Sequence, residues 1–140
     1  MFFIFSKKTL FICLALLVSA IIIVGQIFSA QSGKIDGSTN AKRVEYLKEL
    51  GFEPDDSRVT FKNITVPQEF SAVYKQYNNL QKESGFDLTR YKGKKATVYT
   101  YALSGRENEY AHLIVSDNII IGGDIACAEF NGEMKPLIKK

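Results

Sequence analysis

The sequence has few of the residues that build metal centres, disulfide frameworks and thiol redox sites. It contains one histidine, His112, and two cysteines, Cys13 and Cys127. A zinc site takes three or four ligands, and one histidine with one nearby thiol and scattered carboxylates does not supply them in a recognisable pattern. Cys13 lies inside a long apolar run and Cys127 near the far end of the chain, so a disulfide between them is hard to build. There is also no CxxC pair or Walker loop, and we expect neither a metal nor a cofactor.

A large surplus of positive charge is also missing. The chain has 18 lysine and arginine residues against 15 aspartate and glutamate residues. Lys7 and Lys8 precede the apolar run, which leaves 16 basic and 15 acidic side chains from residue 31 onward. Binding driven by nucleic-acid phosphates needs a larger and clustered basic surplus. The sequence therefore predicts no nucleic-acid partner.

Residues 10–30 form an apolar run without a charge, LFICLALLVSAIIIVGQIFSA. A helix of this length spans roughly 30 Å, the thickness of the hydrocarbon core of a bilayer. The run also fits a secretory signal peptide cleaved after Ala20 or after Ala30. Cleavage after Ala20 would leave an apolar tail, and cleavage after Ala30 would put the bulky Phe28 close to the cut. We therefore favour an uncleaved transmembrane helix or signal anchor.

The flanks of the run predict its orientation and the start of a domain. Basic residues stay on the cytoplasmic side, so residues 1–9 are expected in the cytoplasm and the domain outside. Residues 31–40, QSGKIDGSTN, have the composition of a flexible linker. Residues 41–140 are then one extracytoplasmic domain. The expected location is the cell membrane, with a single pass, and the alternative is secretion after signal-peptide cleavage.

Apolar periodicity predicts an α+β domain in the order α-β-α-β-β-β. A helix is expected over residues 40–50 and a longer one over residues 67–84, which Pro67 would open. Strands are expected over residues 58–66, 95–103, 109–115 and 119–130. A run of consecutive hairpins implies an antiparallel sheet. We therefore expect two helices packed on one face of a mainly antiparallel sheet of about four strands.

Several segments of the domain resemble a known family. They are RVEYLKELGF (43–52), VPQEF (66–70), VYKQYN (73–78), LQK (80–82), GFDL (85–88), YKGK (91–94) and IGGD (121–124). The chain is similar over roughly residues 41–137 to a DUF4830-like family of domains of unknown function from Gram-positive, often clostridial, bacteria. The resemblance implies a short membrane-anchored or exported domain with no established activity. It offers no catalytic residues to carry over.

Cys127 and His112 are the one pair that could serve a nucleophilic enzyme. Both fall on strands of the expected sheet, so a thiol and an imidazole could meet as in thiol enzymes. Apolar neighbours such as Ile125 and Ala126 favour a buried structural thiol, and a single histidine without partners is more often structural. We assign no catalytic residue. Whether the protein is an enzyme stays open, with a small thiol enzyme or hydrolase as the alternative.

Other side chains are candidates for contact with a ligand or partner. The stretch 90–95 is the densest in basic residues and fits a solvated turn, although outside a membrane it could touch anionic headgroups or wall polymers. Two tyrosines on one strand face could belong to the core or to a partner site. The Gly-Gly-Asp segment 122–124 fits a β-bulge better than an anion cradle. The candidate contact residues are Arg90, Lys92, Lys94, Lys95, Tyr99, Tyr101 and Asp124.

These observations favour a non-enzymatic, membrane-anchored module that binds an unidentified protein or small ligand outside the cell. The preference rests on an α+β domain without an assembled catalytic set, because function belongs to sites and not to folds. The host range of the family suggests a further role, as an accessory protein in envelope stress or sporulation.

Overall fold

The computed structural model of the chain describes residues 33–129 and 132–139. Ile35–Lys140 form one compact unit. The expected cytoplasmic segment 1–9 and the expected membrane span 10–30 lie outside the described residues. Among the residues that are described, no helix combines the length and the apolar character needed to cross a bilayer.

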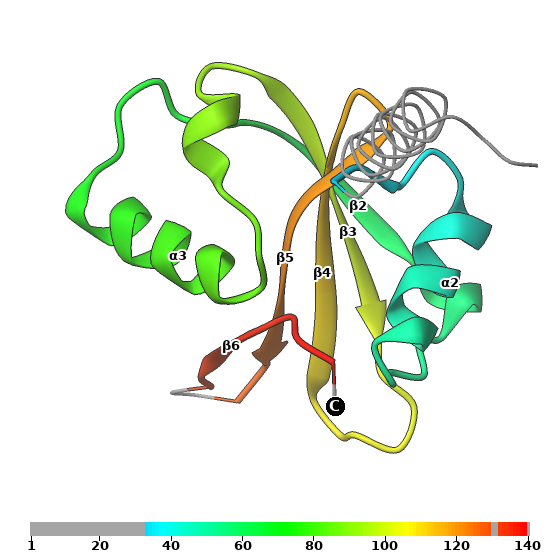
Figure 1. The fold of residues 1–140 in the computed structure, drawn as a ribbon. Coiled ribbons are helices and arrows are strands. Elements are labelled where there is room, and N and C mark those ends of the chain that lie inside the picture. The colour runs from blue at the N-terminus through cyan, green and yellow to red at the C-terminus, as the bar shows by residue number, and fades with distance from the viewer. Residues whose placement is uncertain (1–32, 130–131, 140) are drawn as a thin grey trace, which may run out of the picture. The chain divides into compact units, whose positions relative to one another are not determined.

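Within residues 33–129 and 132–139 the fold consists of two α-helices and a six-stranded antiparallel sheet (Figure 1). The strands lie in the order β1-β5-β4-β3-β2, and β6 pairs with β5 as well. The α+β class and the antiparallel sheet are confirmed, with six strands instead of about four. In chain order the elements are β1 (Ile35–Asp36), α2 (Asn40–Glu49), the 3-10 helix η1 (Asp56–Arg58), β2 (Thr60–Thr65), α3 (Ala72–Glu83), the 3-10 helix η2 (Leu88–Tyr91), β3 (Lys95–Ala102), β4 (Glu109–Ser116), β5 (Ile119–Cys127) and β6 (Met134–Pro136).

Two short strands at the ends of the domain account for the larger sheet. β1 pairs Ile35 with Ile120 of β5, and β6 pairs with the far end of the same strand. Elements of two or three residues are too short to show alternation in a sequence. The sequence therefore predicts a linker over residues 31–40, whereas the structure places β1 within that segment.

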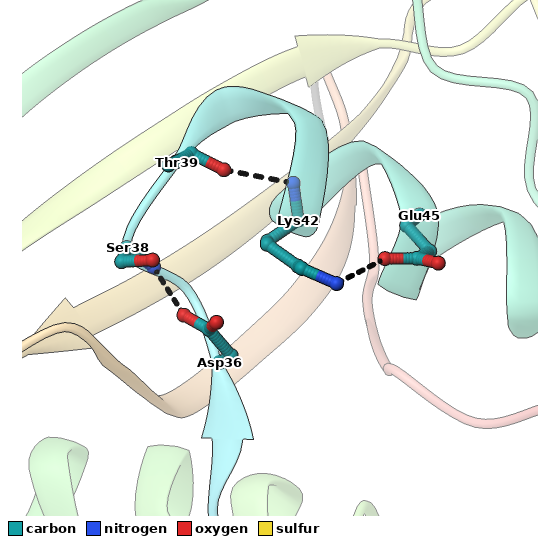
Figure 2. Close-up of polar contacts among 5 residues, drawn as sticks. All are labelled: Asp36, Ser38, Thr39, Lys42 and Glu45. Carbon is teal, nitrogen blue, oxygen red and sulfur yellow. Dashed lines mark hydrogen bonds and ion pairs between the residues drawn. The ribbon is translucent and has the colours of Figure 1, made fainter.

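α2 begins where the sequence predicts it, because side chains satisfy the first free amides. Thr39 is the N-cap, and its Oγ1 accepts a hydrogen bond from the Lys42 N–H over 3.2 Å (Figure 2). Asp36 Oδ1 accepts from the Ser38 N–H over 2.9 Å, which fixes the turn between β1 and the helix. Lys42 and Glu45 form an exposed ion pair over 3.0 Å, a kind of contact that adds little stability.

α3 begins later than the sequence predicts. Proline favours the first turn of a helix, so Pro67 is expected to open it. In the structure Val66 O instead accepts from the Gly93 N–H over 2.8 Å, so the carbonyl that a helix opening at Pro67 would use for its first bond is bonded to the turn before β3. Ser71 then caps α3, because its Oγ accepts from the Tyr74 N–H. A non-local backbone bond therefore overrides the local preference of the proline.

The two helices lie on opposite faces of the sheet, which corrects the expectation that both pack on one face (Figure 1). α2 packs Val44 and Leu47 against the face that carries Tyr101 and Leu113, called here the α2 face. The opposite face carries Ile114, packs against η2 and the aromatic side chains of α3, and is called here the α3 face.

Burial of two strands on both sides explains this arrangement. Residues 113–116 of β4 and residues 120–125 of β5 are buried without interruption. A strand that is covered on both faces is apolar along a continuous run and does not alternate. The runs Leu-Ile-Val at 113–115 and Ile-Ile-Ile at 119–121 have this character. A sheet with two apolar faces needs a covering layer on each.

Candidate functional site

An open groove of about 630 Å³ lies over the ends of β2, β3 and β4, mainly on the α2 face. Cross-strand register builds its floor by setting Asn63 opposite Thr97 and Thr97 opposite Val115. Alternate residues of a strand share a face, so these side chains lie on the same surface as Tyr99. The lining residues are Asn63, Ile64, Thr65, Lys95, Ala96, Thr97, Tyr99, Val115, Ser116, Asp117 and Asn118.

Neutral hydrogen-bonding side chains dominate this lining. Amides and hydroxyls are contributed by β2, β3 and the turn between β4 and β5, whereas Lys95 and Asp117 are the two charged lining residues. Thr97 Oγ1 donates to Asn63 Oδ1 over 3.0 Å, which holds both side chains in place. Amide and hydroxyl groups both donate and accept hydrogen bonds. The groove therefore suits a polar ligand that does the same.

An exposed aromatic side chain stands beside the groove. Phe61 is opposite Tyr99 in the register of β2 and β3, and their ring centroids lie 6.3 Å apart at an angle of 43°. Phe61 is 69% exposed, one of few large apolar side chains so open to solvent among the described residues. The two rings form an aromatic border of the groove, and the exposed ring of Phe61 is open to contact with a ligand.

A buried arginine stands behind the groove wall. Arg43 of α2 is 6% exposed, and its guanidinium lies 3.6 Å from the ring centroid of Tyr99. Its Nε donates to Tyr101 Oη over 2.9 Å and its Nη1 donates to Gly37 O over 2.8 Å. No carboxylate lies within 4.0 Å of Arg43 in the part of the chain that the structure describes.

Gly37 connects Arg43 to the rim of the groove. Its carbonyl accepts from Arg43, and its N–H donates to Asn118 O over 2.9 Å. A Cβ at this position would lie 2.8 Å from Ile120 Cγ1, closer than side chains tolerate. A glycine is therefore required for the arginine and the turn between β4 and β5 to approach each other.

Tyr101 completes the network around the arginine. It is fully buried, and its hydroxyl accepts from Arg43 and donates to Asn40 Oδ1 over 2.7 Å. Burial raises the pKa of Tyr101, and the hydrogen bond and charge of Arg43 oppose that shift in part. The phenol stays neutral at physiological pH and serves as a fixed donor and acceptor.

A second polar cluster lies on the α3 face, away from the groove. Asp124 of β5 is 1% exposed; it accepts from Tyr77 Oη over 2.7 Å and lies 2.9 Å from His112 Nδ1. Burial first, and then the charge of Asp124, raises the pKa of Tyr77. This cluster joins α3 to the middle of the sheet.

The pairing of Cys127 with His112 is wrong, because their side chains lie on opposite faces. Cys127 has the same parity on β5 as Ile125, which packs in the core of the α2 face. His112 contacts Asp124, whose side chain lies on the α3 face. The geometry therefore keeps the Cys127 thiol and the His112 imidazole apart.

The residues predicted as ligand contacts are spread over three places. Lys95 and Tyr99 both line the groove, and Tyr101 lies further along the same face of β3 as a partner of Arg43. Asp124 belongs to the cluster on the α3 face. The other three are exposed around η2 and the turn after it, and they are Arg90, Lys92 and Lys94.

The sequence did not single out the neutral residues of the groove or Arg43. Asn63 and Thr65 are exposed strand residues and Thr97 is a half-buried one, and none of them stands out when seen alone. Only the register of β2 and β3 brings them together.

Comparison with known proteins gives one match. A family model described as "Domain of unknown function (DUF4830)" matches residues 46–125, more than half of the chain. The matched region includes the lining of the groove but not Arg43. No curated protein and no solved structure matches the chain. The resemblance to this family is confirmed, and the expected bacterial host range stays a prediction.

Proposed function

This chain belongs to the DUF4830 family of domains of unknown function, and we propose that its domain is a non-enzymatic binding module that holds a carbohydrate in the groove. The observation that carries the proposal is a groove of about 630 Å³ whose lining is mostly neutral amides and hydroxyls beside an exposed aromatic ring. Sugars present hydroxyl groups that donate and accept hydrogen bonds, which matches this lining.

The aromatic border supports a sugar over other polar ligands. Phe61 is 69% exposed and lies next to Tyr99, so a flat apolar surface adjoins the polar floor. A sugar ring has an apolar face of C–H groups and a polar rim, and it can contact both at once. Exposed apolar side chains beside a cleft are typical of binding sites.

The proposal places the module outside the cell. Residues 10–30 are the proposed anchor, with the amino terminus in the cytoplasm. The ligand would then be a polymer or glycan of the cell surface, held without being cleaved.

The test uses the full chain in detergent micelles with neutral oligosaccharides, the tetramers of glucose, galactose and N-acetylglucosamine. We expect one of them to bind, and Phe61→Ser to weaken its affinity by about tenfold, which is about 1.4 kcal/mol. Thr97→Val should weaken it as well, because it removes a hydroxyl oxygen that can accept from the ligand and the hydrogen bond that holds Asn63 in place. The ligand recovered after long incubation should have an unchanged mass.

Val73→Ser is the matched control, because Val73 is 76% exposed on α3, away from the groove. Its affinity should equal that of the unmodified chain. Equal losses in Phe61→Ser and Val73→Ser would count against the groove. Shortened ligand would show an enzyme, and absence of binding to every sugar tested would refute the proposal.

A further inference from the structure

Arg43 is a buried cation without an acidic partner. It is 6% exposed, and no carboxylate approaches within 4.0 Å in the described ranges 33–129 and 132–139. Of its five N–H groups, one on Nε and one on Nη1 donate to Tyr101 and Gly37. Buried charges in proteins are usually paired, because removing them from water is costly. Its hydrogen bonds to neutral groups and its stacking on a ring hold the guanidinium in place without adding a negative charge beside it.

This charge lies at the wall of the groove. Arg43 stacks on Tyr99, a lining residue, over 3.6 Å. Through Gly37 it is also joined to Asn118, another lining residue. Lys95 adds a second positive charge to the lining, and Asp117 is the one acidic lining residue. The groove and its wall therefore carry a net positive charge.

We infer that the ligand carries a negatively charged group, a carboxylate or phosphate of an acidic carbohydrate, which lies near Lys95 and Tyr99. This inference rests on the proposed carbohydrate site and specifies that the carbohydrate bound there is acidic. Charges held in a partly dry wall act more strongly on an anion than the same charges in water. Complementary charge would select the acidic sugar over a neutral one of the same shape.

The experiment compares two matched ligands on the full chain in detergent micelles. The tetramers of galacturonic acid and of galactose differ in their carboxylates, and an oligomer of glycerol phosphate supplies phosphodiesters. We expect at least one anionic ligand to bind about tenfold more tightly than the galactose tetramer at low ionic strength. The preference should shrink as salt is raised, because salt screens exposed charges.

Lys95→Gln should reduce the preference for the acidic ligand by about fivefold, because it removes the exposed charge of the lining. Lys75→Gln is the matched control, because Lys75 is an exposed lysine of α3 outside the groove. This variant should prefer the acidic ligand as strongly as the unmodified chain does. Arg43→Lys and Arg43→Met test the buried charge, with the thermal unfolding temperature checking that each variant is folded.

The outcomes separate the two proposals. Binding of galactose and acidic tetramers with equal affinity, and no effect of Lys95→Gln on their ratio, would overturn the inference and leave the carbohydrate site standing. Binding of the glycerol phosphate oligomer with no binding of any sugar would overturn the carbohydrate site, and with it the inference that rests on that site. Absence of binding to all of these ligands and to the neutral tetramers would overturn both.

Discussion

Asp124 lies in the middle of β5 with 1% of its surface exposed, and both of its carboxylate oxygens have partners. Tyr77 donates to one over 2.7 Å, and His112 Nδ1 lies 2.9 Å from the other. Burial and the charge of Asp124 raise the pKa of Tyr77, so its hydroxyl keeps its proton and remains a donor at physiological pH. The hydroxyl is therefore a fixed link between α3 and the sheet.

Tyr77→Phe should lower the free energy of unfolding by about 1.5–3 kcal/mol, the range for a hydrogen bond to a charged group. Urea denaturation followed by circular dichroism measures the loss. Tyr74→Phe makes the same chemical change at a half-buried position of α3 whose hydroxyl has no hydrogen bond to any described residue. It should cost far less, and equal losses in the two variants would contradict the role of the Asp124 bond.

Asp87 gives the domain an acid-sensitive contact. Its Oδ1 accepts from Thr89 Oγ1, the Thr89 N–H and Asn78 Nδ2. The Thr89 side chain first, and then Asn78, lowers the pKa of Asp87 to about 2. Because the folded pKa lies below the unfolded value of about 3.9, the stabilisation is present above about pH 4 and is lost as the pH falls through about 2.

Asp87→Asn should therefore be less stable than the unmodified chain by a constant amount above about pH 5, and that difference should shrink between about pH 4 and pH 2. Unfolding by urea at a series of pH values checks this. Thr89→Val should flatten the same acid slope, because the folded pKa of Asp87 would lie closer to the unfolded value. A stability difference that widens on acidification would contradict the assignment.

Single residues also mark what the sequence could predict of the site. It indicates Lys95 and Tyr99, both of which line the groove. It cannot indicate Arg43, because an arginine in the first turn of a helix resembles an ordinary surface residue. Its burial follows from Tyr101 on β3, at a sequence separation of 58 residues. Partners that far apart depend on tertiary packing and not on local pattern.

At the scale of elements, local signals placed α2 and the three long strands well. Capping by Thr39 and the apolar spacing of α2 are local, and so is the alternation of β2. Local sequence signals do not determine which side of the sheet each helix covers. On α3 the apolar Val73 is 76% exposed, whereas the polar Asn78 and Gln81 are buried. Gln81 accepts from the Gly123 N–H of β5 and Asn78 accepts from the Leu88 N–H of η2. Part of the buried side of this helix is therefore polar, and apolar spacing does not reveal it.

The glycine pair of β5 permits close packing where the strand has covering layers on both sides. The register between β4 and β5 shifts at Ile114 and Val115, next to the expected bulge at Gly122 and Gly123. A Cβ on Gly123 would lie 2.6 Å from His112 O, closer than packed atoms allow.

Gly123→Ala should lower the free energy of unfolding by about 1–3 kcal/mol, the usual cost of overpacking. The measurement is again urea denaturation. Gly33→Ala is the control, because nothing lies within 4 Å of a Cβ at that position. If the two alanine variants proved equally stable, the close approach of β4 to β5 would not be the reason for the glycine.

At the scale of the whole molecule, residues 10–30 are expected to keep the chain in the membrane. After alkaline carbonate washing, the protein should stay in the membrane pellet with the full mass of 15.7 kDa. Protease added outside intact cells should remove the domain. A shorter mass would show cleavage of a signal peptide, and a full-length chain free in the soluble fraction would contradict the anchor.

The pairing of Ile35 with Ile120 joins strands that are 85 positions apart in the chain. During synthesis β1 leaves the ribosome early, but its only partner strand emerges near the end. The sheet can close only once nearly the whole polypeptide is available, and such distant pairing slows folding. Chains cut short before β5 would leave β4 as an open edge, a template for aggregation. Folding of this domain therefore depends on completion of translation, because β1 cannot pair until β5 has been synthesised.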